Sequence, residues 1–255
     1  MKHIKKKFRG ERILTEEDKL HIGTKVPTYS IKDGSKELKH QKAAIISEAG
    51  KIIEAFSYAV NGKDYLVPEP DPVLIHFNNA YVLFREMQAA KKKLFKILDG
   101  GNSDENISQE LYLYFGMCNG CIVFLFTAIE AFINKYIPDT YRFEDSKNNR
   151  TEVYNKDQIQ RHLSFDVKLK EVLPKIEGKD FAKRHPLIWV HINNLKELRD
   201  MVVHTKTDSK GKTPYEYIFK KALNFKYEEA LHSVRDLINF YQPDYVVECD
   251  CGEDY

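Results

Sequence analysis

The segment from Leu111 to Ile129 contains no charged side chain, and this feature restricts the possible folds of the chain more than any other. The segment is long enough to border on a membrane-spanning helix. Gly116, Asn119 and Gly120 dilute its apolar character, however, and a glutamate flanks it on each side. The whole chain has the polarity of a water-soluble protein, with 31% charged and 42% hydrophobic residues. We therefore expect a buried helix at the centre of a helical bundle and no membrane span.

The composition excludes several other classes of protein. The 255 residues suffice for one large domain, or for one domain with an appendage. The formal net charge of +2 is too small for an overall field to attract nucleic acid, so such binding would require a local basic patch. The basic N-terminus is not followed by an apolar run, and four cysteines in this length do not indicate a disulfide framework. We therefore expect a cytoplasmic protein without a secretory signal.

Residues 1–72 differ from the remainder, because turn signals and β-forming stretches are frequent there. Residues 51–60 favour a strand, and Asn61-Gly62 joins two such stretches, which is a good signal for a β-hairpin. Alternating prolines between residues 68 and 72 then stiffen the chain. We interpret this part as a small strand-rich N-terminal appendage followed by a proline-rich linker.

A helical domain is predicted for residues 73–243, and an acidic tail for residues 244–255. Asp71 is the expected N-cap of the first helix, with Pro72 in the first helical position. Residues 139–157 are polar and are predicted to form a loop. The expected helices span residues 72–98, 107–137, 165–176, 187–204 and 215–241. The fold class is therefore predicted to be mainly α, a bundle of four to five helices.

The helix predicted to end at His204 also carries Arg199 and Asp200. Arg199 falls within the apolar stripe of this helix and not on its wet face. A guanidinium on a packed face requires a partner for its charge, or a cleft in which it meets a ligand. Glu130 is the natural partner, because it is a lone carboxylate in an apolar stretch of the long helix. Asn134 lies one turn further along the same face and would extend the network.

An arginine binds phosphate through its planar fork of donors, and a histidine accepts or donates a proton near neutral pH. In an ideal helix the two motif side chains lie about 140° apart, so the helix must loosen near Val203 or a second subunit must complete the site. A chain of this size contains about one such arginine–histidine spacing by chance. Arg184 with His191 is a second match, which we set aside because Pro186 separates the two. His191 is expected to be a core or interface residue.

These features resemble the HEPN superfamily (higher eukaryotes and prokaryotes nucleotide-binding) of all-helical domains. The family motif is an arginine followed after four to six residues by a histidine, often with Asn, Asp or His directly after the arginine. Arg199, Asp200 and His204 match these three positions. Residues 127–134 are similar to the acidic helix of the family. The resemblance covers about residues 73–241 and does not include the N-terminal appendage.

The resemblance implies a metal-independent endoribonuclease that uses no cofactor and cleaves RNA as a homodimer. Arg199 would bind the scissile phosphate, His204 would move the proton of the attacking 2′-hydroxyl or the leaving group, and Asp200 would orient one of them. Glu130 and Asn134 would support the arginine. The product would carry a 2′,3′-cyclic phosphate. Many family members act in toxin–antitoxin, abortive-infection and CRISPR-linked defence systems, so an antitoxin or regulatory protein is a further expected partner.

Other interpretations of the same residues remain open. Arg199 and Glu130 would also suit a purely structural ion pair, and the helix dipole favours a histidine at a C-terminus without any catalysis. Some HEPN domains have lost catalysis, so a non-catalytic module for dimerisation or partner binding is the alternative function. A nucleotide-binding partner of a nucleotidyltransferase is a third.

The cysteines and one lysine run carry weaker signals. Cys118 and Cys121, with Cys249 and Cys251, would be the ligands of a four-thiolate zinc site. Because the first pair lies in the apolar helix and the second in the tail, ordinary thiols are the favoured interpretation. Residues 91–93 are consecutive lysines, which are expected to form a solvated surface.

Overall fold

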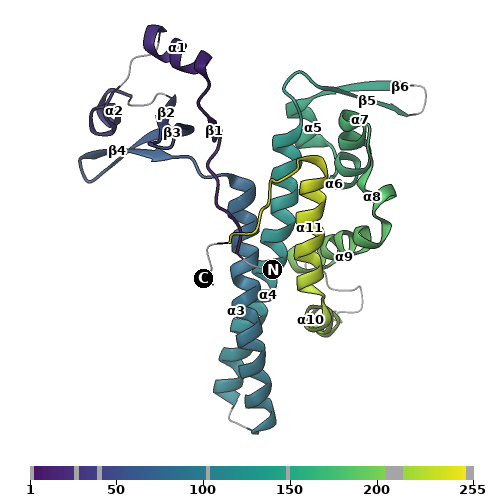
Figure 1. Cartoon of the computed structure of the whole chain (residues 1–255). Coiled ribbons are helices and arrows are strands. Elements are labelled where there is room, and N and C mark those ends of the chain that lie inside the picture. Colours follow the sequence, from purple (N-terminus) through teal and green to yellow (C-terminus); the bar gives the residue numbers. More distant parts are fainter. Residues whose placement is uncertain are drawn as a thin grey trace. The chain divides into compact units, whose positions relative to one another are not determined.

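The computed structural model describes residues 3–25, 29–38, 42–101, 104–147, 150–204 and 215–250. These residues are mainly helical, with a strand-containing part at the N-terminus, as expected at this level (Figure 1). The chain forms two compact units. The smaller comprises Lys6–Ile75, and the larger comprises Met1–Lys5 with His76–Tyr255.

The smaller unit contains an antiparallel sheet in which β3 (Lys51–Val60) pairs with every other strand. Asn61 and Gly62 connect β3 to β4 with φ angles of 50° and 75°, the left-handed conformation that a two-residue hairpin turn requires. The predicted hairpin is thus confirmed. Two helices in this unit were not predicted, since the sequence there is rich in turn residues. The remaining elements are β1 (Arg12–Ile13), α1 (Glu16–Lys25), α2 (Ile31–Glu37), β2 (Lys42–Ile46) and β4 (Lys63–Pro68).

The helix α3 (Pro72–Asp99) begins at the predicted residue. The Asp71 carboxylate accepts the backbone N–H groups of Val73 at 2.9 Å and Leu74 at 3.2 Å. These bonds satisfy amide groups that no carbonyl of the helix can reach. Asp71 is therefore the N-cap, as the sequence indicated.

In the larger unit α3 is followed by the long helix α4 (Asp104–Tyr136), which runs antiparallel to it (Figure 1). Contacts between the two helices join His76 with Phe124, Met87 with Cys118, and Lys93 with Glu110. Gly120 allows a close approach, because a Cβ atom there would lie 2.8 Å from Leu83 Cδ1. Residues 76–93 of α3 thus pack against residues 110–124 of α4.

Among the described residues, α4 is the one helix that is long and apolar enough to cross a membrane, over Ile107–Tyr136. Half of its most apolar stretch is buried inside the protein. The helix contacts α9, α10 and α11, and Ile122, Leu125 and Ile129 are completely enclosed. The central helix of a soluble bundle satisfies the same criterion of length and composition, and this burial is what we expected from the uncharged run.

The region after α4 corrects one prediction. Residues 139–157 were expected to form a loop, but they contain the antiparallel strands β5 (Arg142–Lys147) and β6 (Arg150–Asn155). Phe143 is completely buried, whereas most of the other side chains in the hairpin are polar. One buried position is too little to produce the alternating pattern by which strands are recognised. The hairpin leads directly into α5 (Lys156–His162), which was also not predicted.

Short helical pieces connect α5 to the motif helix. The helix predicted for residues 165–176 is present as α6 (Phe165–Val167), the π-helical turn η1 (Lys168–Val172) and α7 (Leu173–Glu177). A further short helix, α8 (Phe181–Arg184), was not predicted. These pieces place Asp166 beside Lys196 of the motif helix, and Lys170 over the ring of Trp189 in the same helix.

The motif helix is α9 (Pro186–Val203), close to its predicted bounds. The last helical region was predicted as one helix but consists of α10 (Tyr215–Asn224) and α11 (Tyr227–Tyr241). They are separated because Lys226 has a non-helical ψ angle of 76°. α9 packs against α4, α8, α10 and α11, so it lies inside the larger unit. The predicted loop at residues 205–213 lies outside the described residues.

Residues 3–5 lie against residues 247–249 in the larger unit. The Lys5 amide donates to the Val247 carbonyl at 2.8 Å, and the Cys249 amide donates to the His3 carbonyl at 2.7 Å. Ile4, Tyr245 and Val246 are buried. Residues 3–5 and the start of the acidic tail therefore belong to the helical unit, whereas the sequence analysis had assigned them to separate segments.

Candidate active site

The packing of α9 holds the candidate residues in place. Ile192, Leu195 and Leu198 are fully buried, and they fix the rotation of the helix about its axis. Arg199 follows directly on this buried face, and 24% of its side chain is exposed. The prediction that this arginine lies on a packed face is confirmed.

The Arg199 guanidinium has three partners. Its Nη2 lies 3.5 Å from Glu130 Oε2 on α4, and its Nη1 donates to Asp200 Oδ1 at 2.9 Å. It also lies 4.2 Å above the centre of the Phe126 ring, a cation–π contact. The predicted ion pair with Glu130 is thus present. Phe126 was not singled out in the sequence, because an aromatic residue in an apolar helix gives no sign of such a contact.

Asn134 has a different role from the one expected. Its side-chain oxygen is buried and has no hydrogen-bond partner within the described residues. Its backbone carbonyl accepts a hydrogen bond from the side-chain Nε2 of Gln160 at 2.9 Å. The side-chain oxygen therefore does not extend the network around Arg199.

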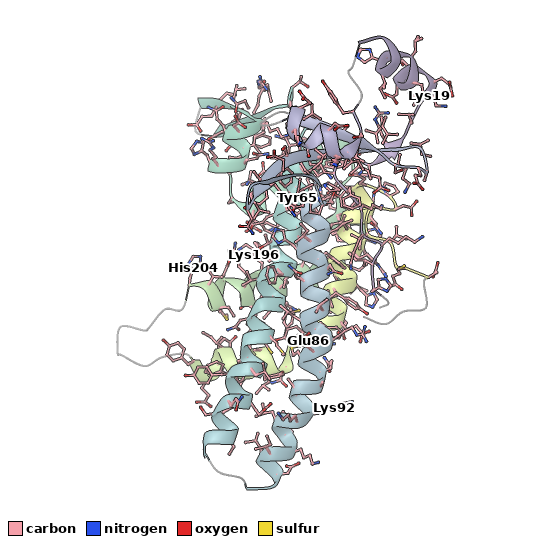
Figure 2. The ribbon with its side chains drawn as sticks, turned by 90° about the vertical axis from the view of Figure 1, so that its left-hand side faces the viewer. Lys19, Tyr65, Glu86, Lys92, Lys196 and His204 are labelled. Carbon is pink, nitrogen blue, oxygen red and sulfur yellow. The ribbon has the colours of Figure 1, made fainter. Side chains whose placement is uncertain are left out.

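His204 is the residue that ends α9. Its φ and ψ angles of −111° and 61° are not helical, while its backbone N–H still donates to the Asp200 carbonyl at 2.9 Å. The helix thus ends at Val203, where the sequence analysis required it to loosen. The imidazole is exposed at the end of the helix (Figure 2). This change of direction does not bring it to Arg199, since no contact joins the two side chains.

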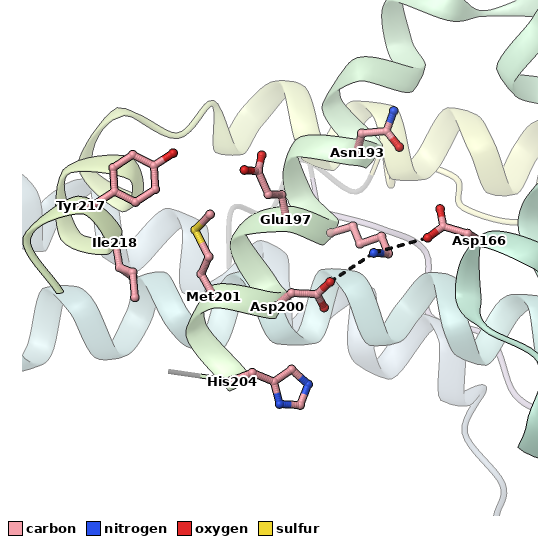
Figure 3. A pocket seen from close by; sticks show the side chains of 9 residues that line it. Asp166, Asn193, Glu197, Asp200, Met201, His204, Tyr217 and Ile218 are labelled. Atoms are coloured by element: carbon pink, nitrogen blue, oxygen red, sulfur yellow. Dashed lines mark hydrogen bonds and ion pairs between the residues drawn. The ribbon is translucent and has the colours of Figure 1, made fainter. Parts of the chain in front are cut away.

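Asp200 and His204 line the same groove, which we call the His204 groove (Figure 3). Its volume is about 840 Å³, and it lies between α6, the C-terminal half of α9 and α10. The lining residues are Asp166, Asn193, Lys196, Glu197, Asp200, Met201, His204, Tyr217 and Ile218. Arg199 is not one of them. Asp200 is thus the candidate residue that both contacts Arg199 and faces the groove with His204.

Charged side chains of alternating sign form a row through Asp200, which we call the charge row. Lys196 Nζ lies 3.2 Å from Asp200 Oδ2 and 3.4 Å from Asp166 Oδ2, as the dashed lines in Figure 3 show. Asp166 also pairs with Lys170 at 3.1 Å. The charge row therefore runs from Lys170 through Asp166, Lys196 and Asp200 to Arg199, and ends at Glu130 on α4. It connects three separate segments of the fold at the candidate site.

The charges in the charge row shift the pKa values of two of its members, Lys196 and Asp166. The hydrogen bond to Asp200 raises the pKa of Lys196, although burial opposes the shift and Asp166 adds to it. Burial acts to raise the pKa of Asp166, but the hydrogen bonds and charges of Lys170 and Lys196 outweigh it and lower that pKa. Both groups are therefore held in their charged forms.

A further lysine, Lys168, lies near Glu130, where the charge row ends. Burial lowers the pKa of Lys168 on η1, while the negative charge of Glu130 acts in the opposite direction. Lys168 Nζ also donates to the Gln160 carbonyl at 2.6 Å. Glu130 thus lies in the field of two cations, Arg199 and Lys168.

Sequence reasoning did not identify Lys196, Asp166 or Lys168 as site residues. Lys196 could have been found, because it precedes Asp200 by four residues and so lies on the same side of a helix. Asp166 and Lys168 come from a segment distant in sequence, and only the tertiary fold brings them to α9.

The His204 groove carries more negative than positive charge. Asp166, Glu197 and Asp200 contribute three carboxylates, whereas Lys196 contributes one ammonium group. A phosphate would be repelled by these carboxylates unless another cation approached. The groove of a single chain thus offers a proton-transfer group, His204, without a free phosphate-binding group beside it.

The thiols of the described residues do not form a metal site. Cys118 and Cys121 are buried in α4, and Cys118 Sγ lies 3.2 Å from Met87 Sδ. Burial raises the pKa of both thiols, which disfavours the thiolate that a metal requires. Cys251 lies outside the described residues. Within the described part of the chain, no group of three or more His, Cys, Asp or Glu side chains is arranged to hold a metal ion.

No protein-family model, curated protein or solved structure matches this chain significantly.

Proposed function

We propose that the protein is a metal-independent endoribonuclease that acts as a cytoplasmic homodimer. One observation carries the proposal: Asp200 connects an arginine that is anchored on Glu130 to the groove that contains an exposed histidine. The HEPN-like motif residues thus share one helix end in a helical unit, and His204 is accessible to a substrate.

In the proposed reaction the 2′-oxygen of a ribose attacks the adjacent phosphorus atom. A His204 imidazole accepts the proton of the 2′-hydroxyl, and the departing 5′-oxygen receives a proton from an imidazolium. The bond between phosphorus and the 5′-oxygen breaks, which leaves a 2′,3′-cyclic phosphate and a 5′-hydroxyl. Arg199 stabilises the negative charge that develops on the phosphoryl oxygens. All proton transfers use side chains of the protein, so no metal is required.

A second copy of the chain supplies what one copy lacks. One subunit provides a single His204, whereas the reaction uses both a base and an acid. Arg199 of the same subunit faces α4, and the His204 groove is acidic. Two motifs that face each other would place a second histidine and a second guanidinium at one cleft. The dimer is therefore part of the proposal and not an addition to it.

The proposal is tested by incubating the purified protein with total RNA in EDTA. Wild type should cleave the RNA, and His204→Ala should abolish cleavage while its oligomeric state and melting temperature are retained. His162→Ala is a matched control, because His162 is also an exposed histidine near a helix C-terminus. Intact RNA with folded, dimeric wild type would contradict the proposal. Equal cleavage by wild type and His204→Ala would assign the activity to another source.

We further propose that this activity serves as a toxin or in defence against phage, under the control of an antitoxin or regulatory protein. Expression of wild type should then arrest the growth of a bacterial host, whereas His204→Ala should not. Equal growth with both proteins would contradict this role.

A second candidate function is a non-catalytic module for dimerisation or for binding a protein or nucleotide. It is favoured by the full engagement of Arg199 with two carboxylates and an aromatic ring. This alternative predicts that Arg199→Ala lowers the melting temperature and changes nothing else. Nucleotide binding would appear as thermal stabilisation by the ligand without turnover.

A further inference from the structure

A second groove lies between α9 and α10 and has the opposite charge. Its volume is about 450 Å³, and we call it the lysine groove. Lys220, Lys221 and Lys226 line it, together with His191, Tyr217 and Phe225. No carboxylate is among the described residues that line it, whereas three carboxylates line the His204 groove. The lysine groove is therefore suited to an anionic ligand.

The two grooves adjoin each other. Tyr217 lines both of them, and 56% of its surface is exposed. Lys221 Nζ in the lysine groove pairs at 2.7 Å with Glu197, which lines the His204 groove. A chain-like ligand that occupied the lysine groove would therefore extend past Tyr217 toward His204.

Two of the lysines are available to such a ligand. The side chain of Lys220 is 69% exposed and pairs with Glu216, which is itself 78% exposed. Lys226 is 70% exposed, and its Nζ lies 3.9 Å from Glu229. Ion pairs that water surrounds in this way contribute little to stability, so a phosphate group can replace the carboxylate at small cost. Lys221 is mostly buried, and its Nζ pairs with Glu197 and lies 5.8 Å from the centre of the Tyr217 ring.

The combination of ammonium groups with an exposed aromatic ring is typical of surfaces that bind single-stranded nucleic acid. The lysines would contact successive phosphates, and a base would stack on the face of Tyr217. We infer that the lysine groove binds the backbone of single-stranded RNA next to the scissile phosphate. The inference deepens the proposed ribonuclease function and rests on it for the identity of the ligand.

The test measures binding separately from cleavage. The full chain with His204→Ala is titrated into a fluorescein-labelled oligouridylate in EDTA, and fluorescence anisotropy gives Kd at several salt concentrations. Lys220→Gln with Lys226→Gln should weaken binding at low salt. It should also reduce the slope of log Kd against log salt by about 1.4, since each phosphate contact of a single strand contributes about 0.7. Circular dichroism confirms that the variants are folded.

Matched variants separate the groove from general charge. Lys92→Gln with Lys96→Gln removes two exposed lysines of α3 with the same change in net charge, and should leave Kd nearly unchanged (Figure 2 shows Lys92). Tyr217→Ala should weaken binding about tenfold, while Tyr217→Phe, which retains the ring, should restore it. Equal losses in the two double-lysine variants, or no loss in either, would overturn the inference.

The outcomes also distinguish this inference from the proposed function. Binding that depends on the lysine groove, without cleavage by wild type, would refute the ribonuclease and support the groove. Cleavage by wild type with unchanged binding in the lysine-groove variants would support the ribonuclease and refute RNA binding at the lysine groove. A glutamate-rich peptide that competes as strongly as the oligonucleotide would assign the groove to an acidic protein and overturn the inference.

Discussion

Two glycines of α4 provide a sharp test of the central packing. Gly116 is exposed and nothing lies within 4 Å of a Cβ atom added there, whereas a Cβ on Gly120 would meet Leu83 Cδ1 at 2.8 Å. Alanine is favoured over glycine inside a helix by about 0.8–1 kcal/mol, so both substitutions gain this amount. Gly116→Ala should therefore raise the free energy of unfolding by about 0.8–1 kcal/mol.

Gly120→Ala has an additional cost. Overpacking a well-filled contact costs about 1–3 kcal/mol, and the lower half of that range applies because the contacted atom ends a flexible side chain. We therefore expect Gly120→Ala to lie about 1–2 kcal/mol below Gly116→Ala in urea unfolding. In a Leu83→Ala background the obstacle is absent, and the two alanine variants should be equally stabilising. Equal stabilisation by both variants in the wild-type background would refute the packing of α3 on Gly120.

Two further predictions concern Asp166 and the N-cap of α5. The pKa of Asp166 is below its ordinary value of 3.8, so its charge stabilises the folded state above that pH and this contribution is lost as the pH falls through the folded-state pKa. Asp166→Asn should thus be less stable than wild type near about pH 7, and the difference should shrink as the pH falls below about 3.8; a difference that stayed constant through this fall would contradict the ion pairs. Asn155 and Gln158 each accept the other's backbone N–H at 2.9 Å, so Asn155→Ala should lower the unfolding free energy by about 1 kcal/mol, while Asn155→Asp should retain most of it. Equal unfolding free energies for Asn155→Ala and wild type would contradict the cap.

The sequence predicted those parts of the fold whose local signals agree with their tertiary surroundings. The start of α3 depends on one aspartate and one proline, and the β3–β4 turn depends on two residues that tolerate positive φ. By contrast, the β5–β6 hairpin buries one large side chain, Phe143, so no apolar alternation marks it. The break at Phe225–Lys226 carries neither glycine nor proline, and tertiary packing determines it.

The candidate site was predictable to a similar extent. A guanidinium on an apolar face needs a partner or a cleft, and the uncharged surroundings of Glu130 made it the natural candidate, whereas the closer contact of Arg199 with Asp200 was not predicted. The three acids and the lysine of the His204 groove come from α6 and α9, and the proximity of these two helices is a property of the tertiary fold. The lysine groove was not predicted for the same reason, since only the tertiary fold brings His191 and Asn194 of α9 beside the lysines of residues 220–226.

The position of Asp200 explains why one chain holds a motif without a complete site. Neighbouring residues on a helix point about 100° apart, so Arg199 faces α4 while Asp200 faces the His204 groove. Glu130 and Phe126 hold the arginine on the α4 side, and Lys196 with Asp166 holds the aspartate on the groove side. Within the described residues, the contact between Arg199 and Asp200 joins the cluster on the α4 side to the cluster on the groove side. In the proposed reaction, a phosphate that took the Nη1 hydrogen now donated to Asp200 would leave this carboxylate to Lys196. Under the proposed function, substrate binding at Arg199 would thus be coupled to the charge balance of the His204 groove through Asp200.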